Sequence, residues 1–337
     1  MPTWGEILRE VNQSKAPQGT GPDFDGVRRR YLRALHDLTG RAVILYSSAF
    51  LESPSTPPTD LQISLADIQG IMETVVNVTE RNLDLILHSP GGSAEAAESI
   101  VEYLRQRFDH IRVFIPLAAM SAATMVALSG DEIVMGQHSQ LGPIDPQVII
   151  STPEGPRSAP AKAILNQFEL AKEQCKDTSN LAAWMPILRS YAPGLLTQCE
   201  DSRKLAVTMV STWLRKYMFA NDSEALKKSA AIANWFADYE NFHSHLRRVG
   251  RDKVSEIGVN VIPLEKEHDL QDAVLSIHHA TMHTFSGTPA VKIIENHHGR
   301  AWVIMAHRIM LQPVPVIPPG TPAAPNRAER RRIARGR

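Results

Sequence analysis

Short apolar runs alternate with segments of helical periodicity through the first half of the chain. The runs 42–46, 83–88, 111–116 and 132–135 are rich in valine, isoleucine and leucine and have the length of buried strands. Amphipathic segments such as 93–108 lie between them, and strands joined through helices are typical of parallel βαβ units. The pattern therefore predicts an α/β fold, whose ligand site should lie beyond the carboxyl ends of the strands.

The two ends of the chain differ from this middle part. Residues 1–40 are predicted to form a helical N-terminal arm, in which Thr3 and Glu6 fit a capping box. Residues 41–310 hold the α/β core and then a helix-rich C-terminal part. Residues 311–337 are rich in proline and then in arginine, which predicts an extended or disordered tail. We therefore expect an arm, one large domain and a tail.

Charge is balanced over the whole chain, with 36 basic and 36 acidic residues, but it is unevenly distributed. Arginines gather at the C-terminus, so the rest of the chain is mildly acidic, which argues against a nucleic-acid-binding face on the folded part. The arginine-rich tail could contact a nucleic acid or another anionic partner, although a solvated tail is the simpler interpretation. The basic run 28–30 is likewise expected to face solvent.

Cysteine use and hydropathy bear on the location of the protein. The only two cysteines, Cys175 and Cys199, argue against a disulfide framework and favour a reducing, cytoplasmic location. No secretory leader is visible at the start of the chain. The uncharged run 113–130 is long enough for a membrane span, but Pro116 interrupts it, and a buried strand followed by a buried helix explains it better. We therefore expect no membrane span.

Two of the predicted strands end in residues that suit hydrolytic chemistry. Gly91 and Gly92 follow strand 83–88 and can offer backbone N–H groups to a negatively charged oxygen. Ser121 follows strand 111–116 at the start of a helix of small residues, where a serine can act as a nucleophile. The structural alternatives are a glycine turn and a serine that caps a helix. Because both motifs follow parallel strands, we expect them to lie together.

Three motifs carry a resemblance to a known family. Residues 89–92 read Ser-Pro-Gly-Gly, residues 120–124 read Met-Ser-Ala-Ala-Thr, and residues 141–146 read Leu-Gly-Pro-Ile-Asp-Pro. In this order and spacing they resemble the ClpP/crotonase-fold serine peptidases, and in particular the serine dehydrogenase proteinase family, with signal peptide peptidase A and the archaeal stomatin-cleaving peptidases as relatives. The resemblance implies a ClpP/crotonase-like spiral of βαβ units, a homo-oligomer, a protein or peptide substrate, and an ATP-independent serine peptidase without a cofactor.

The general base has two candidates. The membrane-type relatives use a lysine well after the serine, and Lys162 stands at the corresponding position from Ser121. A lysine acts as a base only when burial lowers its pKa toward neutrality, and otherwise Lys162 is an ordinary exposed lysine at a helix start. His138 is the reserve base. The N–H of Ala122, next to the nucleophile, is expected to be a further oxyanion donor beside those of Gly91 and Gly92.

Two other functions stay open. A crotonase-type acyl-CoA enzyme shares the oxyanion chemistry without a serine nucleophile, and a non-catalytic scaffold would keep the fold and bind peptides without cutting them. No Gly-x-Gly-x-x-Gly motif follows a strand, so NAD binding has no support. His279 and His283 could share a helix face, but the glutamate of a zinc-peptidase motif is missing. We therefore expect no metal site, and surface or interface positions for the C-terminal histidines.

Overall fold

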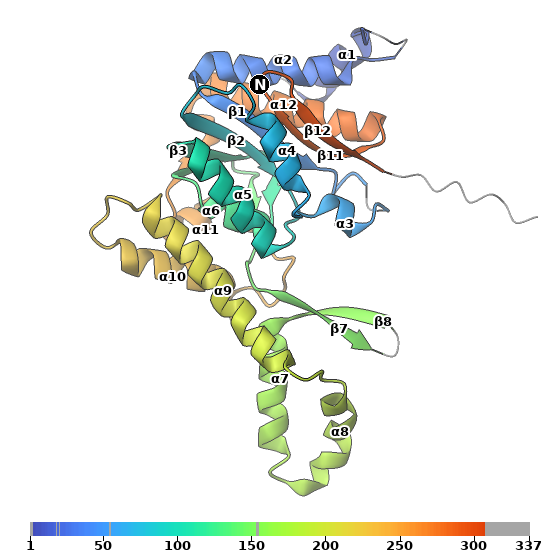
Figure 1. Cartoon of the computed structure of the whole chain (residues 1–337), viewed down its shortest axis with the longest axis vertical. Coiled ribbons are helices and arrows are strands. Elements are labelled where there is room, and N and C mark those ends of the chain that lie inside the picture. The colour runs from blue at the N-terminus through green and yellow to red at the C-terminus, as the bar shows by residue number, and fades with distance from the viewer. Residues whose placement is uncertain (1–2, 18, 20, 54, 153–154, 307–337) are drawn as a thin grey trace, which may run out of the picture. The chain divides into compact units, whose positions relative to one another are not determined.

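The computed structural model describes residues 3–17, 19, 21–53, 55–152 and 155–306. Figure 1 shows helices packed around one large sheet. The strands of this sheet, in spatial order, are β10 (Val261–Pro263), β5 (Glu132–Met135), β3 (His110–Ile115), β2 (Asn82–His88), β1 (Ala42–Ser48), β11 (Ala290–Asn296) and β12 (Ala301–Met305).

The sheet is parallel except at one edge. β10, β5, β3, β2 and β1 run in the same direction, whereas β11 is antiparallel to β1 and β12 is antiparallel to β11. Each crossover between the parallel strands β1, β2 and β3 contains a helix, as the alternation of apolar runs and amphipathic segments predicts. The predicted α/β class is therefore confirmed, and β2 and β3 end at the same edge.

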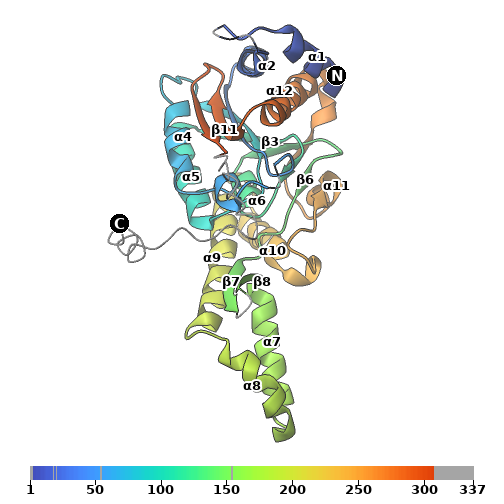
Figure 2. The same ribbon diagram turned by 90° about the vertical axis from the view of Figure 1, so that its right-hand side faces the viewer.

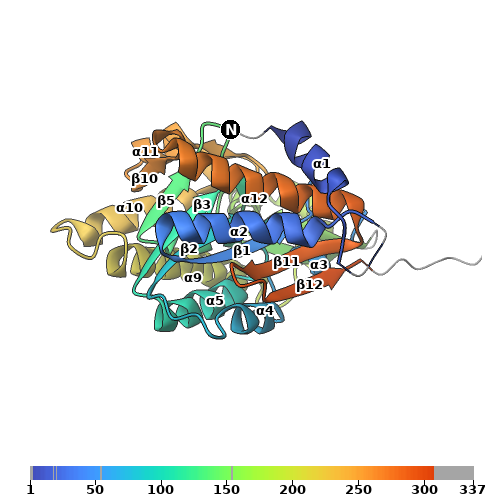
Figure 3. The ribbon, with the colours of Figure 1, turned by 90° about the horizontal axis from the view of Figure 1, so that it is seen from above.

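Helices cover both faces of the sheet, which explains why β1, β2, β3 and β11 are buried along almost their whole length. α2 (Phe24–Thr39) and α12 (His268–Gly287) lie side by side over one face (Figure 3). The other face packs against α4 (Asp67–Thr74), α5 (Ala94–Arg107) and α6 (Ala122–Leu128). The remaining helices are α1 (Trp4–Gln13), α3 (Pro58–Leu61), α7 (Ala161–Gln174), α8 (Leu181–Arg189), α9 (Leu195–Lys216), α10 (Ala225–Ala237), α11 (Arg251–Glu256) and the 3₁₀ turns η1 (Thr178–Asn180), η2 (Tyr239–Asn241) and η3 (Leu264–Lys266).

Two small sheets stand beside the large one. The first contains β4 (Ala118–Ala119), β6 (Gln140–Leu141) and β9 (Val249–Gly250), and the second is a hairpin of β7 (Gln147–Thr152) and β8 (Gly155–Pro160). The hairpin leads into α7 and α8, which extend away from the large sheet in two perpendicular views (Figures 1 and 2). α8 buries none of its residues. The predicted homo-oligomer, for which such an exposed helix would be available, stays a prediction.

The N-terminal helices are built as the sequence indicates, with one exception. Thr3 and Glu6 form the expected capping box at the start of α1. The expectation that the basic run faces solvent is wrong for Arg28, whose side chain is fully buried. Its Nε donates to Oε2 of Glu295 at 2.6 Å, and its Nη1 donates to Oγ1 of Thr284 at 2.9 Å. The reason is that α2 packs against α12 and the sheet, so this side of the helix never meets water.

The sequence also led us to expect no membrane span and a C-terminal tail. Among the residues described, no helix is long and apolar enough to cross a membrane. The uncharged run 113–130 instead forms β3, β4 and α6, as predicted. The predicted tail, residues 311–337, lies outside the described residues.

Candidate active site

The chain segments that follow β2 and β3 are joined side by side. Ser89 donates its backbone N–H to the carbonyl oxygen of Ala118 at 3.1 Å, and Met120 donates its N–H to the carbonyl oxygen of Ser89 at 2.9 Å. A methyl group placed on Gly91 would lie 2.7 Å from Cβ of Ser121. The two motifs that the sequence singles out therefore lie in direct contact, at the carboxyl ends of their strands.

The loop after β2 accepts only glycine at two successive positions. Gly91 has a φ of +91°, and a methyl group there would collide with the carbonyl oxygen of Met120. Gly92 has a φ of +154°, and a methyl group there would lie 2.5 Å from the backbone nitrogen of Ile63. Two hydrogen bonds fix Ile63 against the loop. Its N–H donates to the carbonyl oxygen of Gly91 at 2.7 Å, and its carbonyl oxygen accepts from the N–H of Ser93 at 3.0 Å.

The N–H groups of this loop differ in what they already contact. The N–H of Gly91 donates to Oγ of Ser89 at 3.2 Å. Within the described residues, no acceptor pairs with the N–H of Gly92 or of Ala122. Among the three expected oxyanion donors, the structure thus leaves those of Gly92 and Ala122 available, while that of Gly91 is in use.

The backbone of Ser121 is strained. It is one of the few residues other than glycine with a positive φ, at φ +51° and ψ −122°. Ser121 is the N-cap residue of α6, but its side chain makes no capping hydrogen bond. In the part of the chain that the structure describes, its hydroxyl has no hydrogen-bond partner. A strained serine at a strand-to-helix turn is the arrangement that exposes a nucleophile.

The third motif packs directly behind this turn. Oγ1 of Thr124 donates to the carbonyl oxygen of Ala119 at 2.8 Å and accepts from the N–H of Gly142 at 3.0 Å. A methyl group on Gly142 would lie 3.1 Å from Sδ of Met120. The close approach of segment 141–146 therefore holds the turn that carries Ser121.

This segment also supplies one half of an acid–histidine pair that the sequence did not reveal. Asp145 is buried, and its Oδ1 lies 2.6 Å from Nδ1 of His245. Its Oδ2 accepts from Nε2 of Gln147 at 2.9 Å. A carboxylate held against Nδ1 orients an imidazole so that Nε2 can exchange a proton with a substrate or a nucleophile. The two residues are 100 positions apart, and His245 belongs to no motif, so only Asp145 carried a sequence signal.

Neither of the predicted bases contacts the serine in the described residues. Lys162 is the second residue of α7, is half-buried, and lines a surface hollow together with Glu200 and Lys204 of α9. No hydrogen bond or ion pair joins it to Ser121 among the residues described. His138 is exposed in the turn after β5, and nothing in the same part of the chain joins it to the serine either.

A buried network supports the glycine loop from behind. Nζ of Lys292 donates to the carbonyl oxygen of Gln62 at 2.7 Å, the residue before Ile63. Nζ also lies 3.0 Å from Oδ1 of Asp67, while Oδ2 of Asp67 accepts from the hydroxyl of Tyr46 at 2.7 Å. Burial, together with the Asp67 carboxylate, raises the pKa of Tyr46 well above its usual value of 10. The network ties β1, β11 and α4 to the strand-like segment that clamps the loop.

A fully buried histidine ends β2, immediately before the first motif. The ring of His88 packs against Phe50, with centroids 4.8 Å apart, and against His278, with centroids 5.1 Å apart. Burial lowers its pKa from 6.5 to about 4, and the positive charge of Arg248 adds to the shift. His88 is therefore neutral at physiological pH.

The expectation that the C-terminal histidines lie at the surface or in interfaces is wrong for several of them. His278, His283 and His297 are buried. α12 is covered by α1 and α2, so that Nε2 of His283 lies 3.1 Å from the carbonyl oxygen of Trp4 and the ring of His279 packs against the same tryptophan. His279 and His283 thus serve helix packing in this structure.

Comparison with known proteins identifies a matching family. A family model described as a ClpP-like SDH-type serine proteinase matches residues 61–261, which include all three motifs. Two uncharacterized proteins of Methanocaldococcus jannaschii, MJ1495 and MJ0137, are 27% and 26% identical to the chain over 59% and 60% of its length. The matched part spans 60% and 64% of those two proteins.

Solved structures that match include two mutants of the "1510-N membrane-bound stomatin-specific protease", one of them in complex with a substrate peptide. Each is 17% identical, with a TM-score of 0.35, over 60% of this chain. The aligned regions cover 75% and 71% of those chains. The family match and the parallel-rich sheet together establish the ClpP-like fold that the sequence predicts.

Proposed function

Because the chain belongs to the ClpP-like SDH-type serine proteinase family, we propose that it hydrolyses peptide bonds without ATP, through an acyl-enzyme formed on Ser121. The observation that carries the proposal is the contact between the strained Ser121 and the glycine loop at Gly91. A scaffold that only binds peptides would have no need to hold a serine in this backbone conformation.

The proposed reaction has two halves. Oγ of Ser121 attacks the carbonyl carbon of the scissile peptide bond and loses its proton to the base, and the resulting oxyanion is bound by the N–H groups of Ala122 and the glycine loop. Collapse of this intermediate breaks the C–N bond, and the base returns the proton to the departing amine. Water then attacks the acyl-enzyme by the same route and releases the second product.

Gly92 is the loop donor that the hydrogen bonding favours. Its N–H has no acceptor among the described residues, whereas the N–H of Gly91 donates to Ser89. In the proposed site the role of Gly91 is to let the loop approach Ser121 without a side chain in the way.

For the base we propose Lys162, in a Ser-Lys dyad. It is half-buried in the first turn of α7, and no carboxylate pairs with its amine among the residues described. In this conformation Lys162 and Ser121 are not hydrogen bonded to each other. The proposal therefore requires α7 to move toward the serine when substrate binds. Catalytic hydrogen bonds often form fully only in the substrate complex. His138 remains the reserve base, and the oriented His245 is the competing one.

The test is the intact mass of the protein after reaction with a fluorophosphonate probe, combined with hydrolysis of a fluorogenic peptide library. We expect wild type to gain one probe mass and Ser121→Ala to gain none. Lys162→Met should label at least about a hundredfold more slowly, because general-base catalysis contributes that much or more. Absence of labelling in wild type would remove the peptidase proposal and bring forward the scaffold or the acyl-CoA enzyme.

Two further variants separate the bases. His245→Asn and His138→Gln should label at nearly the wild-type rate if Lys162 is the base. A loss confined to His245→Asn, with Lys162→Met unaffected, would transfer the role to the Asp145–His245 pair. Circular dichroism of each variant shows whether it is folded.

A further inference from the structure

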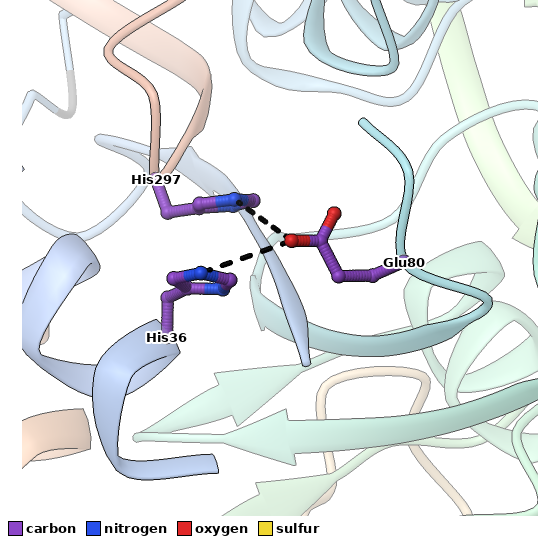
Figure 4. Close-up of side chains that lie close together, drawn as sticks. All are labelled: His36, Glu80 and His297. Atoms are coloured by element: carbon purple, nitrogen blue, oxygen red, sulfur yellow. Dashed lines mark ion pairs between the residues drawn. The ribbon is translucent and has the colours of Figure 1, made fainter. Parts of the chain in front are cut away.

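Three polar side chains converge at the opposite end of the sheet from Ser121. His36 lies near the end of α2, Glu80 precedes β2, and His297 follows β11. Nε2 of His36 is 3.7 Å and Nε2 of His297 is 3.9 Å from the same carboxylate oxygen, Oε1 of Glu80. Figure 4 shows both imidazole rings directed at this oxygen, stacked one above the other.

Within the described residues, the only polar group that faces Nε2 of His36 or Nε2 of His297 is the Glu80 carboxylate. Both nitrogen–oxygen distances are longer than a hydrogen bond. The side chain of His297 is only 1% exposed, and its Nε2 is a buried polar atom without a hydrogen-bond partner among the described residues. Buried polar atoms are nearly always paired, so an unpaired nitrogen aimed at a carboxylate is a candidate to bind a ligand together with that carboxylate.

Hydrogen bonds fix the rest of each side chain. Nδ1 of His36 lies 2.8 Å from the carbonyl oxygen of Arg41. Nδ1 of His297 lies 3.1 Å from the backbone nitrogen of Val43, whose N–H it can accept, and 3.3 Å from the carbonyl oxygen of the same residue. Oε2 of Glu80 accepts from the N–H of Thr79 at 3.0 Å. Metal-binding histidines typically donate Nδ1–H to a carbonyl oxygen, as the contact of His36 with Arg41 allows, which leaves the lone pair of Nε2 for the ion.

We propose that His36, Glu80 and His297 bind a divalent transition metal ion, with Zn²⁺ as the expected occupant. Two imidazoles and one carboxylate suit Zn²⁺, whose bonds to nitrogen and oxygen of about 2.0–2.2 Å place its ligand atoms roughly 3.3 Å apart. The nitrogen–oxygen distances of 3.7 and 3.9 Å need to shorten by about half an ångström, and the two stacked rings, now 13° from parallel, have to turn so that both Nε2 atoms face one ion. A fourth position is open to water or to His298, whose ring centroid is 4.1 Å from that of His297.

The ion would hold three segments of the fold together and would take no part in catalysis. Its ligands come from α2, from the segment before β2 and from the turn between β11 and β12, which are far apart in the sequence. β2 begins at Asn82, next to the proposed site, and ends at His88, next to the glycine loop, so the length of the strand separates the two sites. The proposal is therefore independent of the peptidase chemistry.

The experiment uses the full chain without a polyhistidine tag, freed of metal with a chelator and titrated with Zn²⁺ by calorimetry. Co²⁺ serves as a second probe because it absorbs visibly when tetrahedrally coordinated. We expect one ion per chain and a higher melting temperature with Zn²⁺. Glu80→Gln should weaken Zn²⁺ affinity at least about tenfold and remove the cobalt spectrum.

Two controls test whether a loss of Zn²⁺ affinity is specific to the proposed site. His268→Gln changes an exposed histidine that lies beside Asp272 and should bind Zn²⁺ as wild type does. Glu80 is only partly buried, so Glu80→Gln should fold, and the melting temperature of the metal-free variant checks this. A wild type that binds no Zn²⁺, or a Glu80→Gln variant that binds it equally well, would overturn the proposal whatever the outcome of the probe labelling at Ser121.

Discussion

Lys292 and Asp67 form an ion pair that is closed to solvent, with Nζ 3.0 Å from Oδ1 and both side chains 0% exposed. The same Nζ donates to the carbonyl oxygen of Gln62, next to the residue that is hydrogen bonded to the glycine loop. A buried charge pair at this position costs desolvation energy, which its geometry must offset. We interpret the pair as the part of the structure that positions the loop for Ser121.

Lys292→Met should therefore affect both stability and reactivity. It leaves the carboxylate of Asp67 buried without its cation, and the loss of one partner of a buried pair costs about 3–5 kcal/mol. Urea denaturation measures this change in the free energy of unfolding. At a temperature where the variant is still folded, the fluorophosphonate probe should label Ser121 more slowly than in wild type.

Lys253→Met is the matched control, because Lys253 forms an exposed ion pair with Glu256, three residues along the chain. Its unfolding free energy should change by less than about 0.5 kcal/mol. Wild-type labelling in a folded Lys292→Met would show that the network stabilises the fold without positioning the loop.

Gly91→Ala should stop labelling of Ser121. The added methyl group would lie 2.7 Å from Cβ of Ser121, at a φ of +91° that disfavours alanine. Gly194→Ala has a similar φ of +82° but meets nothing within 4 Å, so it carries the backbone strain alone. It should lose about 1–2 kcal/mol of stability and label as wild type does. Equal labelling of the two variants would contradict the close contact of loop and serine.

The features that sequence alone predicts are those encoded locally. The capping box of Thr3 and Glu6 lies within one helical turn. The meeting of Gly91 with Ser121 follows because parallel neighbouring strands end at one edge, so that two local motifs and one topological rule are sufficient.

The features that could not be predicted from the sequence depend on contacts between residues that are distant in the chain. Arg28 was expected in solvent because nothing near it indicates the buried Glu295, 267 residues away. Asp145 and His245 are likewise joined only by the fold. A charged or titratable residue is buried when a partner happens to lie opposite, and no periodicity in the sequence records that partner.

Ser121→Gly should be more stable than Ser121→Ala, although neither can form an acyl-enzyme. Both remove the hydroxyl, but alanine keeps the strain of φ +51°, which glycine relieves. We expect a difference of about 1 kcal/mol in the free energy of unfolding, measured by urea denaturation. A glycine variant less stable than the alanine variant would argue that the backbone of Ser121 is relaxed.

The buried His88 should make stability depend on pH in a defined window. Its pKa is lowered from 6.5 in the unfolded chain to about 4 by burial, so below pH 6.5 the unfolded state binds more protons than the folded state. The contribution of His88 to stability is therefore complete above pH 6.5 and is lost as the pH falls toward 4, by an amount on the order of 3 kcal/mol.

Urea denaturation between pH 7 and pH 5 excludes most of the carboxylates, because these titrate mainly below that range. Burial also lowers the pKa values of His278, His279 and His297, so these histidines add to the slope in the same direction, and a variant is needed to find the share of His88. His88→Asn should flatten the dependence of the unfolding free energy on pH, whereas replacement of the exposed His268 by asparagine should leave it unchanged. If His88→Asn does not alter the slope, water must reach the His88 ring in the folded protein. The end of β2, which the first motif follows, would then be exposed to solvent.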